Sequence, residues 1–462
     1  MRKILLLAGL LITSLAAQAQ SYNYYFGNIH AHTGYSDGNK DSATSLMSTP
    51  LQDFNYAKQS NHIDFYGISE HNHLQAGLKS PGDYHQGILD ADVVNVDGQF
   101  VAMYGMEWGV ISNGGHVIIY GIDSLIGWDT SDYDIFNAEY DYTSLWKKVN
   151  ARPGAFAYLA HPQTTDYDSI FLKPLSTEAD SAIVGMCARS GPAFSTVDTY
   201  TDASTGNYIP RYKQALQLGY HVGIGLDHDT HYSVFGRQTA GRLVVLASSL
   251  TRLNVLDAIR SMRMYSSDDW NTKVDFNIGS QPMGSIITQA YSPVISVNVN
   301  DPDGEATSSI KVYGGIPGSG VAPTLITSNV NSNTLTYTAT IANNSTYYYY
   351  LQITQADTDV IWTSPIWYTR NDALANGIST FKTENIFNLY PNPSNGFVNI
   401  VLQEVTPSGF EIEVTNELGQ LVYTESTSNM LSTTLDLHDK KGFYIVKVKS
   451  AAGISTKKIM IE

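Results

Sequence analysis

From residue 20 to residue 280 the chain alternates short apolar runs with helix-like segments, and this alternation restricts the possible folds more than any other feature. The apolar runs are predicted as buried strands at Tyr24–Ile29, Asp64–Ser69, Phe100–Met106, His116–Tyr120, Phe156–Ala160 and Val222–Leu226. Helices are predicted at Tyr142–Val149, Ile209–Leu218 and Leu253–Met262. Strand–helix alternation over about 250 residues is typical of an α/β barrel or a layered α/β sheet.

Composition narrows the classes of protein further. Of the 462 residues, 43% are hydrophobic and 15% are charged, which is enough apolar material for a folded core. The net charge of −16 disfavours binding to nucleic acid or to anionic membrane surfaces. Cys187 is the only cysteine, so neither an intrachain disulfide nor a cysteine-based zinc site can form. Any metal must be held by histidine and carboxylate side chains.

Residues 1–19 have the pattern of a signal peptide. Arg2 and Lys3 precede the apolar run Ile4–Leu15, and a small-x-small cleavage pattern follows at Ala17-Gln18-Ala19. The run is too short to anchor the chain in a bilayer, and no other stretch approaches about 18 unbroken apolar residues. We therefore expect an exported protein with no membrane span.

Residues 281–370 have a different pattern, in which apolar and polar residues alternate with period two. The segments Val294–Asn300 and Tyr347–Ile353 are examples, and turn-rich stretches separate such segments. This spacing predicts an immunoglobulin-like β-sandwich. Residues 371–385 are predicted as a linker, and residues 386–462 again have an all-β pattern.

The last module carries four short motifs, which are Leu389-Tyr390-Pro391-Asn392-Pro393, Glu417–Tyr423, Gly442–Val448 and Lys457–Met460. With these motifs, residues 386–462 resemble the C-terminal (Por) sorting domain of proteins that use type IX secretion. The resemblance implies export through the type IX secretion machinery, followed by release or by attachment to the cell surface.

Two histidines stand two residues apart where the first predicted strand ends. Because side chains alternate across a strand, His30 and His32 face the same side, and one metal ion can bind both. The turn Ser36-Asp37-Gly38 then returns a carboxylate toward the same place. A single His-x-His pair is weak evidence, since surface strands contain such pairs by chance.

Four further predicted strands end in side chains of the types that bind metals. These side chains are Glu70, His71 and His73, then Glu107 with His116 shortly after it, then His161, and finally Asp227, His228, Asp229 and His231. In a barrel fold the carboxyl ends of the strands share one edge, where active sites form. We therefore expect these side chains to form a single functional site.

The order of these motifs resembles that of the polymerase and histidinol phosphatase (PHP) family of metal-dependent hydrolases. The order is His-x-His with Ser-Asp-Gly, an acidic-His-Asn triplet, Glu, His, His-Pro and Asp-x-His. The stretches Gly236-Arg237, Arg242–Leu246 and Leu256–Arg260 look like the branch that includes carbaryl hydrolases. Two residues depart from the pattern: Glu70 stands where the triplet usually has Asp, and Asp37 stands where some members have His.

The resemblance implies a fold, a set of metal ligands and a set of catalytic residues. The fold would be a distorted (β/α)7 TIM-like barrel around two or three divalent metal ions, which would be zinc, manganese or iron. One ion would take His30, His32, Glu107 and Asp229, a second would share Glu107 and take His116 and His161, and a third would take Asp37, His71 and His231. The expected catalytic residues are Glu107, Asp229 and His231.

Imidazole and carboxylate ligands suit these metals, and a shared carboxylate holds two cations close together. A water between the cations would lose its proton near neutral pH, and the bridging hydroxide would be the nucleophile. Asp227, His228 or His73 could donate a proton to the leaving group or could only orient a ligand. Arg189 and Arg237 could clamp a phosphate or form structural ion pairs.

Three functions stay open from the sequence. The first is an exported metal-dependent phosphoesterase, because phosphoester hydrolysis is the common activity of the family and clustered cations favour an anionic substrate. The second is hydrolysis of an amide or carbamate ester by the same metal centre. The third is a surface binding protein whose site has lost its activity. The partners expected for an enzyme are a small ester or phosphoester and the type IX machinery, not nucleic acid.

Overall fold

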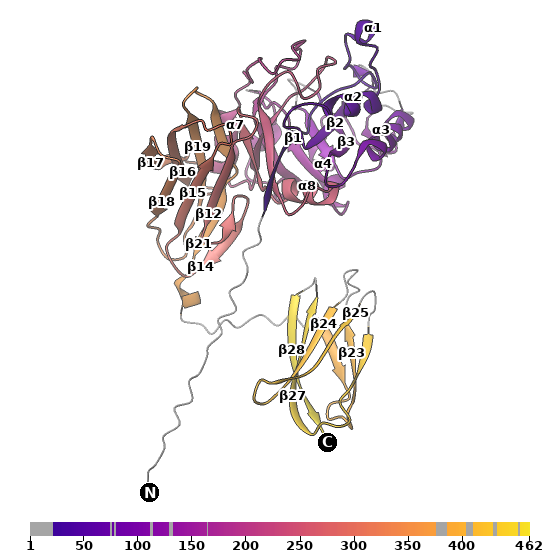
Figure 1. The fold of residues 1–462 in the computed structure, drawn as a ribbon, viewed down its shortest axis with the longest axis vertical. Helices are drawn as coiled ribbons and strands as arrows, with labels where there is room; N and C mark the ends of the chain where they lie inside the picture. The colour runs from indigo at the N-terminus through magenta and orange to yellow at the C-terminus, as the bar shows by residue number, and fades with distance from the viewer. Residues whose placement is uncertain are drawn as a thin grey trace. The chain divides into compact units, whose positions relative to one another are not determined.

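The computed structural model describes residues 22–73, 76–77, 80–110, 114–128, 133–163, 165–375, 386–402, 410–427, 432–450 and 453–462. The predicted signal peptide, residues 1–19, lies outside the described residues. The chain divides into two compact units, one that ends at Asp372 and one that spans Ala373–Glu462 (Figure 1). Each unit is described by itself.

In the first part of the larger unit, strands and helices follow one another along the chain. They are β1 (Asn23–Asn28), α1 (Ser42–Ser45), α2 (Pro50–Ala57), β2 (Phe65–His71), α3 (Pro81–Val94), β3 (Val101–Trp108), β4 (Val117–Tyr120), β5 (Ile126–Gly127), β6 (Ile135–Phe136), α4 (Tyr142–Asn150), β7 (Phe156–Leu159), α5 (Asp168–Phe171), α6 (Thr177–Ala182), β8 (Ile183–Ser190), α7 (Ile209–Leu218), β9 (Gly223–Asp227), β10 (Arg242–Ala247), α8 (Arg252–Arg260) and β11 (Met264–Ser267).

Local sequence signals set where several of these helices begin. Thr49 accepts a hydrogen bond from the backbone N–H of Gln52, and Pro50 follows at the first helical position of α2. Ser80 caps α3 in the same way, and it too precedes a proline. Thr251 caps α8. None of the helices in the described part of the chain is long and apolar enough to cross a membrane.

Nine strands of this part lie in one mixed sheet, in the order β11-β10-β1-β2-β3-β4-β7-β8-β9. β1, β2 and β3 are parallel neighbours, and so are β7, β8 and β9. β4 lies between the two groups and is antiparallel to β3 and to β7, so the six parallel strands end at the same edge. An isolated parallel bridge between Ala31 and Thr230 joins the segments that follow β1 and β9.

The second part of the larger unit is built from strands. They are β12 (Lys273–Ile278), β13 (Gln281–Pro282), β14 (Ile286–Gln289), β15 (Val294–Asn300), β16 (Thr307–Gly315), β17 (Thr324–Val330), β18 (Thr334–Thr338), β19 (Thr346–Gln355), β20 (Val360–Thr363) and β21 (Ile366–Arg370), with a short 3-10 helix at Asp372–Ala375. β12, β13, β15 and β18 form a separate four-stranded sheet. The other strands extend the larger sheet, because β20 pairs with β11.

These two sheets share an apolar core. In β15, Ile295, Val297 and Val299 are buried and the residues between them are exposed. They belong to one cluster with Val312 of β16 and Leu351 of β19. The period-two pattern in the sequence corresponds to this single buried face of the strand.

The prediction of a distorted (β/α)7 TIM-like barrel for residues 20–280 is wrong. The structure is mostly β-sheet, and nine strands of this segment belong to a 15-stranded mixed sheet that continues into residues 281–370. Apolar periodicity locates strands but does not set their direction. A (β/α) barrel needs a helical crossover and a parallel pair at each step, whereas β3 pairs antiparallel with β4 after a short connection, and β1 pairs antiparallel with β10.

The smaller unit contains two antiparallel sheets. Its strands are β22 (Phe387–Tyr390), β23 (Phe397–Leu402), β24 (Phe410–Asn416), β25 (Leu421–Thr427), β26 (Ser432–Asp436), β27 (Gly442–Ser450) and β28 (Gly453–Ile461). The sheet orders are β22-β23-β26 and β25-β24-β27-β28. Both sheets contribute to one core, which includes Phe387, Ile400, Ile412 and Val446.

Candidate metal centre

The ends of β1, β2 and β3 place four of the predicted ligands side by side. His30 and His32 follow the last residue of β1, His71 is the last residue of β2, and Glu107 is the last but one of β3. In the parallel register of β2 and β3, His71 lies opposite Glu107. The sheet register itself therefore brings His71 to the carboxylate of Glu107.

The remaining predicted ligands reach the same edge from other strands. His116 precedes β4, which starts at this edge because it runs antiparallel to β3. His161 follows β7, and Asp229 and His231 follow β9. The bridge between Ala31 and Thr230 sets the segment after β9 beside the His-x-His segment after β1. Asp37 comes from the turn after that segment.

Glu107 is fully buried and lies at the centre of the group. Its Oε1 lies 3.1 Å from His30 Nε2, 3.0 Å from His116 Nδ1 and 3.1 Å from His161 Nε2. Its Oε2 lies 3.3 Å from His32 Nε2 and 3.0 Å from His71 Nδ1. One carboxylate thus contacts five imidazoles.

Two more carboxylates complete the group. Asp229 Oδ1 lies 3.4 Å from His30 Nε2 and 3.2 Å from His32 Nε2. Asp37 Oδ1 lies 3.6 Å from His71 Nε2 and 3.4 Å from His231 Nε2. The structure therefore brings together all nine side chains predicted as ligands.

The nearest neighbours differ from the division that the family resemblance implies. Sets of possible ligand atoms within 4.8 Å of one another are His32, Asp37, His71 and His231, then His30, His32 and Glu107, then His30, His161 and Asp229, and finally His71, Glu107 and His116. His116 is thus grouped with His71, and His161 with Asp229. Each of His30, His32, His71 and Glu107 occurs in two of these sets, which is what shared ligands between neighbouring cations would require.

Several buried polar atoms of the group lack hydrogen bonds. His71 Nδ1, His116 Nδ1 and Glu107 Oε2 have no hydrogen-bond partner among the described residues, although the two nitrogens lie 3.0 Å from Glu107 oxygens. Asp37 Oδ1 also lacks one. Buried polar atoms are nearly always hydrogen-bonded, and unpaired ones call for an unseen ion or water. Lone pairs that converge in this way fit divalent cations.

Without a bound ion, the close packing of carboxylates and imidazoles in the cluster determines their pKa values. Burial would raise the pKa of Glu107, but the charges of His116, His30 and His71 outweigh burial and hold the pKa well below its usual value. Burial would lower the pKa of His32, but the neighbouring carboxylates of Asp229 and Glu107 raise it to about 10. The carboxylates therefore stabilise positive charge next to them, either as protons on the imidazoles or as bound metal ions.

Two residues of the group have strained backbones. His161 has a φ of 22° and Asp229 a φ of 51°, values that residues other than glycine rarely adopt. Such conformations cost about 1–3 kcal/mol each, and they persist where the surrounding structure imposes them. Here the strain directs both side chains toward the same cluster.

Asp227 and Ser190 contact the cluster on the side of His30 that faces away from Glu107. Asp227 Oδ2 lies 3.4 Å from His30 Nδ1, on the side of the ring away from Glu107, and Ser190 Oγ donates to Asp227 Oδ1 at 2.6 Å. Such carboxylate–imidazole pairs orient metal ligands. His228, in contrast, points away: its Nε2 lies 2.8 Å from the carbonyl oxygen of Gly241. His73 stacks on Trp128 with ring centres 5.5 Å apart.

Glu70 holds the loop that carries Asp37. Its carboxylate accepts hydrogen bonds from the backbone N–H of Thr33 at 3.0 and 3.1 Å and from the hydroxyls of Thr33 and Ser36. Ser36 Oγ in turn lies 3.5 Å from His32 Nδ1. Glu70 is therefore a supporting residue, and the sequence pattern could not show which loop it holds.

A cavity of about 420 Å³ opens onto the cluster. Besides the predicted ligands, Gln163, Ser190, Phe194, Tyr208 and neighbouring residues line it, and no sequence motif pointed to these positions. No Lys or Arg is among the described residues that line it, although Lys40 Nζ lies 3.1 Å from the carboxylate of Asp37 at its edge. Arg189 pairs with Asp268 at 3.2 Å, and Arg237 stacks on Tyr56 and donates to Ser60, so neither is placed to clamp a substrate phosphate there.

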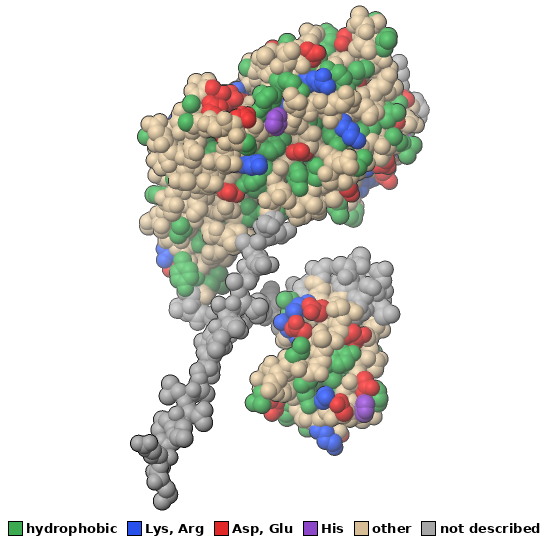
Figure 2. Space-filling view, in the orientation of Figure 1, with side chains coloured by type: hydrophobic (Ala, Val, Ile, Leu, Met, Phe, Trp, Pro, Cys, Tyr) green, Lys and Arg blue, Asp and Glu red, His purple; other side chains and the backbone are tan. Residues whose placement is uncertain are grey.

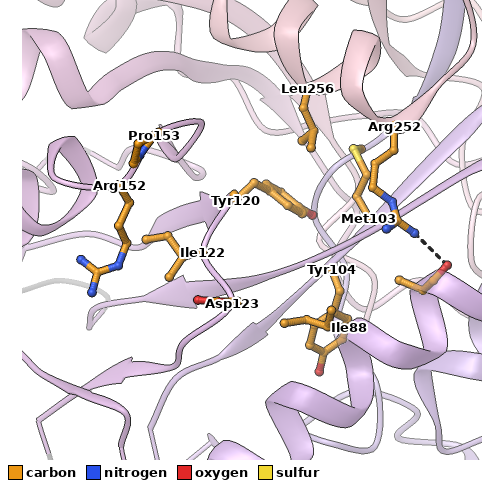
Figure 3. Close-up of a pocket in the computed structure, with 12 residues that line it drawn as sticks. Ile88, Met103, Tyr104, Tyr120, Ile122, Asp123, Arg152, Pro153, Arg252 and Leu256 are labelled. Carbon is orange, nitrogen blue, oxygen red and sulfur yellow. Dashed lines mark hydrogen bonds between the residues drawn. The ribbon is translucent and has the colours of Figure 1, made fainter. Parts of the chain in front are cut away.

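A second cavity, of about 460 Å³, lies elsewhere on the same strands (Figure 3). Met103, Tyr104, Tyr120 and Leu256 point into it, and Arg252 at its side donates to the carbonyl of Ala91 at 3.0 Å. Its lining includes one acid, Asp123, and no histidine. This cavity therefore lacks the groups that hydrolytic chemistry needs.

Three histidines outside the motifs lie outside the cluster. His62 packs against Trp270, His85 pairs with Asp134 at 3.1 Å and His221 pairs with Asp180 at 3.0 Å. Cys187 is buried.

Comparison with curated proteins finds two uncharacterized proteins, from Chlamydia pneumoniae and Chlamydia muridarum, each 28% identical over 185 residues. The match covers 36% of this chain and 29% of each relative, so the chain spans less than a third of the relatives' length.

Among solved structures, the chain is similar to fibronectin(III)-like modules of CbhA from Clostridium thermocellum, with 16% identity, a TM-score of 0.24, and coverage of 41% of this chain and 94% of that one. It is also similar to the FN1–FN3 domains of chicken CNTN1, with 13% identity, a TM-score of 0.22, and coverage of 38% and 62%. At these TM-scores the likeness supports no assignment.

The C-terminal unit matches a known family of domains. Residues 388–462 match the family of secretion system C-terminal sorting domains, as the motifs of the last module predicted. The protein therefore carries a type IX secretion sorting domain at its C-terminal end, and it is exported to the cell surface or beyond.

Proposed function

We propose that this protein is an exported metal-dependent hydrolase and that its substrate is a phosphoester. One observation carries the proposal: the buried carboxylate of Glu107 contacts five imidazoles within 3.0–3.3 Å, and its Oε2 accepts no hydrogen bond from the described residues. A carboxylate shared in this way is the usual bridge of a two-metal hydrolytic site. The order of motifs that resembles the PHP family supports the same assignment.

The ligands available would hold two or three divalent cations such as zinc, manganese or iron. They are His30, His32, Asp37, His71, Glu107, His116, His161, Asp229 and His231. When bound, such cations acidify a water molecule and neutralise negative charge that develops on the substrate.

The chain's own groups set the orientation of these ligands. The carboxylate of Asp227, 3.4 Å from His30 Nδ1, favours the ring orientation in which Nε2 faces the other ligands. His231 Nδ1 lies 2.8 Å from the carbonyl oxygen of Asp229, which can only accept, so Nδ1 carries the hydrogen. Its Nε2 is then left to bind a cation or to hold a proton at the wall of the cavity. Asp229 and His231 are therefore the proposed catalytic residues beside Glu107.

A second candidate is hydrolysis of a neutral amide or carbamate ester by the same centre. Two features of the cavity favour it: the described lining contains no Lys or Arg, and it contains the aromatic rings of Phe194 and Tyr208. Phosphoester sites commonly add such cations to the metals, because a guanidinium matches phosphate oxygens in pairs. A neutral substrate with an aromatic leaving group would not need them.

The experiment that separates these functions combines elemental analysis with turnover. The purified full chain is loaded in turn with zinc, manganese or iron and offered a nitrophenyl phosphate and a naphthyl carbamate. We expect at least two equivalents of metal and a preference for the phosphate. Preference for the carbamate would support the second candidate. Failure to retain any of the metals would contradict both enzymes and support a surface binding protein.

A further inference from the structure

Three loops of the larger unit bring seven carboxylates together away from the histidine cluster. The loops connect β11 to β12, β15 to β16 and β19 to β20, and the acids are Asp268, Asp269, Asp301, Asp303, Glu305, Asp357 and Asp359. Hydrogen bonds join the loops: Thr272 Oγ1 donates to Asp301 at 3.2 Å, and the backbone N–H of Asp357 donates to Glu305 at 2.7 Å. Figure 2 shows acidic side chains gathered on one part of the larger unit.

Little positive charge balances these acids. Within the part of the chain that the structure describes, one ion pair reaches them, between Arg189 and Asp268 at 3.2 Å. One oxygen each from Asp269, Asp301 and Glu305 lies within 4.8 Å of the other two. Like charges held this close repel one another unless a cation lies between them.

Two buried amides provide a second, independent observation. Gln355 is 1% exposed and Asn271 is 5% exposed. Gln355 Nε2 donates to Asp301 Oδ2 at 2.8 Å, and Asn271 Nδ2 donates to Asp303 Oδ2 at 2.9 Å. The carbonyl oxygens of both amides accept no hydrogen bond from the described residues.

The unpaired oxygens point to a missing ligand. A buried carbonyl oxygen without a partner is costly, and both amide groups are directed into the acidic group, because Gln355 Nε2 contacts Asp301 and Asn271 Nδ2 contacts Asp303. The oxygen and nitrogen of an amide can exchange places by rotation about one bond. Rotation of Gln355 would set its Oε1 against Asp301, which is favourable only with a cation between the two oxygens.

We propose that these three loops bind a Ca²⁺ ion, with Asp269, Asp301 and Glu305 as carboxylate ligands and the side-chain oxygen of Gln355 as a neutral ligand. All the donors are oxygen atoms, and a set of three carboxylates and an amide oxygen suits Ca²⁺ better than Zn²⁺, which takes nitrogen and sulfur ligands, or Mg²⁺, which demands near-ideal octahedral geometry. An exported protein meets free Ca²⁺, and comparable extracellular modules bind it with a Kd of about 0.1–1 mM.

The protonation of the neighbouring acids agrees with uncompensated charge. Burial, together with Asp357 and Asp268, raises the pKa of Asp359 to about 7. Burial also raises the pKa of Asp268, against the opposing charge of Arg189. A bound divalent cation would offset the repulsion between neighbouring carboxylates that contributes to these raised pKa values.

The position of the site predicts a structural role. Residues 268–272 connect β11 of the larger sheet to β12 of the four-stranded sheet. Asp301 and Glu305 follow β15, and Gln355 ends β19. A cation held by all three loops would tie the two sheets together at this end, and the folded state would gain stability with rising Ca²⁺ concentration.

The test uses Tb³⁺, which replaces Ca²⁺ at oxygen sites and emits when a nearby indole is excited. Trp270 Nε1 donates to Asp303 Oδ2 at 3.2 Å, so an indole lies at the site. We expect the full chain to sensitise Tb³⁺ emission, Ca²⁺ but not equal Mg²⁺ to displace it, and 1–5 mM Ca²⁺ to raise the Tm by a few degrees relative to EGTA. Trp270→Phe should reduce the emission and leave the Ca²⁺-dependent Tm shift intact.

Variants of the proposed Ca²⁺ ligands and of the histidine cluster show which site produces the Tb³⁺ emission and the Tm shift. Asp301→Asn and Glu305→Gln should weaken Ca²⁺ binding at least tenfold and abolish the Tm shift, whereas Glu107→Gln, in the histidine cluster, should retain both. In EGTA the first two variants should be at least as stable as the parent chain, because each removes a repelling charge. Emission that persists in both variants, or titration calorimetry of the parent chain that shows no binding up to 10 mM Ca²⁺, would overturn the proposal.

Discussion

The buried carboxylate of Glu107 contacts five imidazoles, and other residues must keep those rings in their orientation. At Glu107 the distances are near 3 Å on both oxygens, so a small rotation of one ring would break the arrangement. Asp227 and Glu70 supply that support, from the end of β9 and of β2. We therefore expect these supporting carboxylates to matter for metal binding although they touch no substrate.

Asp227→Asn tests this support. The amide keeps the size of the side chain but removes the charge beside His30 Nδ1, so we expect metal affinity to fall about 10–100-fold while the fold persists. Competition with a chelator measures the affinity, and circular dichroism checks the fold. Asp180→Asn is the control, because Asp180 makes the same kind of pair with His221 outside the site. Equal losses in both variants would remove the orienting role of Asp227.

Asp359 gives a pH-dependent prediction. Burial and neighbouring acids raise its pKa to about 7 in the folded protein, above its unfolded value of 3.8. A raised carboxyl pKa means that the stabilising contribution is present below about pH 4 and is lost as the pH rises through 7. In EGTA, Asp359→Asn should therefore raise the stability at pH 8 by about 1 kcal/mol after allowance for solvent screening, and leave it unchanged at pH 4.

Thermal unfolding at the two pH values measures this difference. A gain of the same size at pH 4 and pH 8 would show that the carboxyl charge of Asp359 is not its source.

At the scale of elements, the site depends on how closely β1, β2 and β4 approach one another. A Cβ atom at Gly67 in β2 would lie 2.3 Å from the hydroxyl oxygen of Tyr120 and 2.9 Å from the Cα of Ile29. That tyrosine hydroxyl donates to the carbonyl oxygen of Ile29 at 2.8 Å, next to His30. The glycine therefore lets β2 lie close enough for the ligands after β1 to reach Glu107.

Gly67→Ala should destabilise the protein by about 1–3 kcal/mol, because the added methyl group overpacks the contact, and it should weaken metal binding as well. Denaturant unfolding and chelator competition measure the two effects. Gly82→Ala in α3 is the matched control, because its nearest neighbour would be Ser80 Oγ at 3.4 Å. If Gly67→Ala were as stable as the control, the close approach would not be essential.

The sequence predicted positions better than it predicted topology. The six strands and three helices predicted in residues 20–280 are close to elements of the structure, whereas β8, β10, α2 and α3 were not predicted. The nine predicted ligand side chains converge because several strands share one direction. The barrel was wrong because periodicity carries no information on pairing: β4 and β10 are apolar runs like the others, yet they run antiparallel to their neighbours. Phe194 and Tyr208 reach the cavity through loop and helix geometry that no spacing rule encodes.

At the scale of the whole molecule, export depends on the C-terminal unit. Residues 388–462 match the sorting domain family, and the unit has its own apolar core. Deletion of residues 386–462 should leave the protein inside cells of a bacterium that has type IX secretion, because the machinery then has no signal to bind. Immunoblots of cell and medium fractions measure this. Export of the truncated chain at the normal level would show that another segment carries the signal.

Whether Glu107 bridges two metal ions is decided by the metal content of the full chain compared with that of Glu107→Gln. The account predicts that the parent chain retains at least two equivalents of a transition metal and hydrolyses an ester, and that the variant loses most of both while its circular dichroism is unchanged, because the amide cannot bridge two cations. If the variant kept the same metal content and turnover, Glu107 would not be the bridge and the proposed hydrolytic centre would have to be given up.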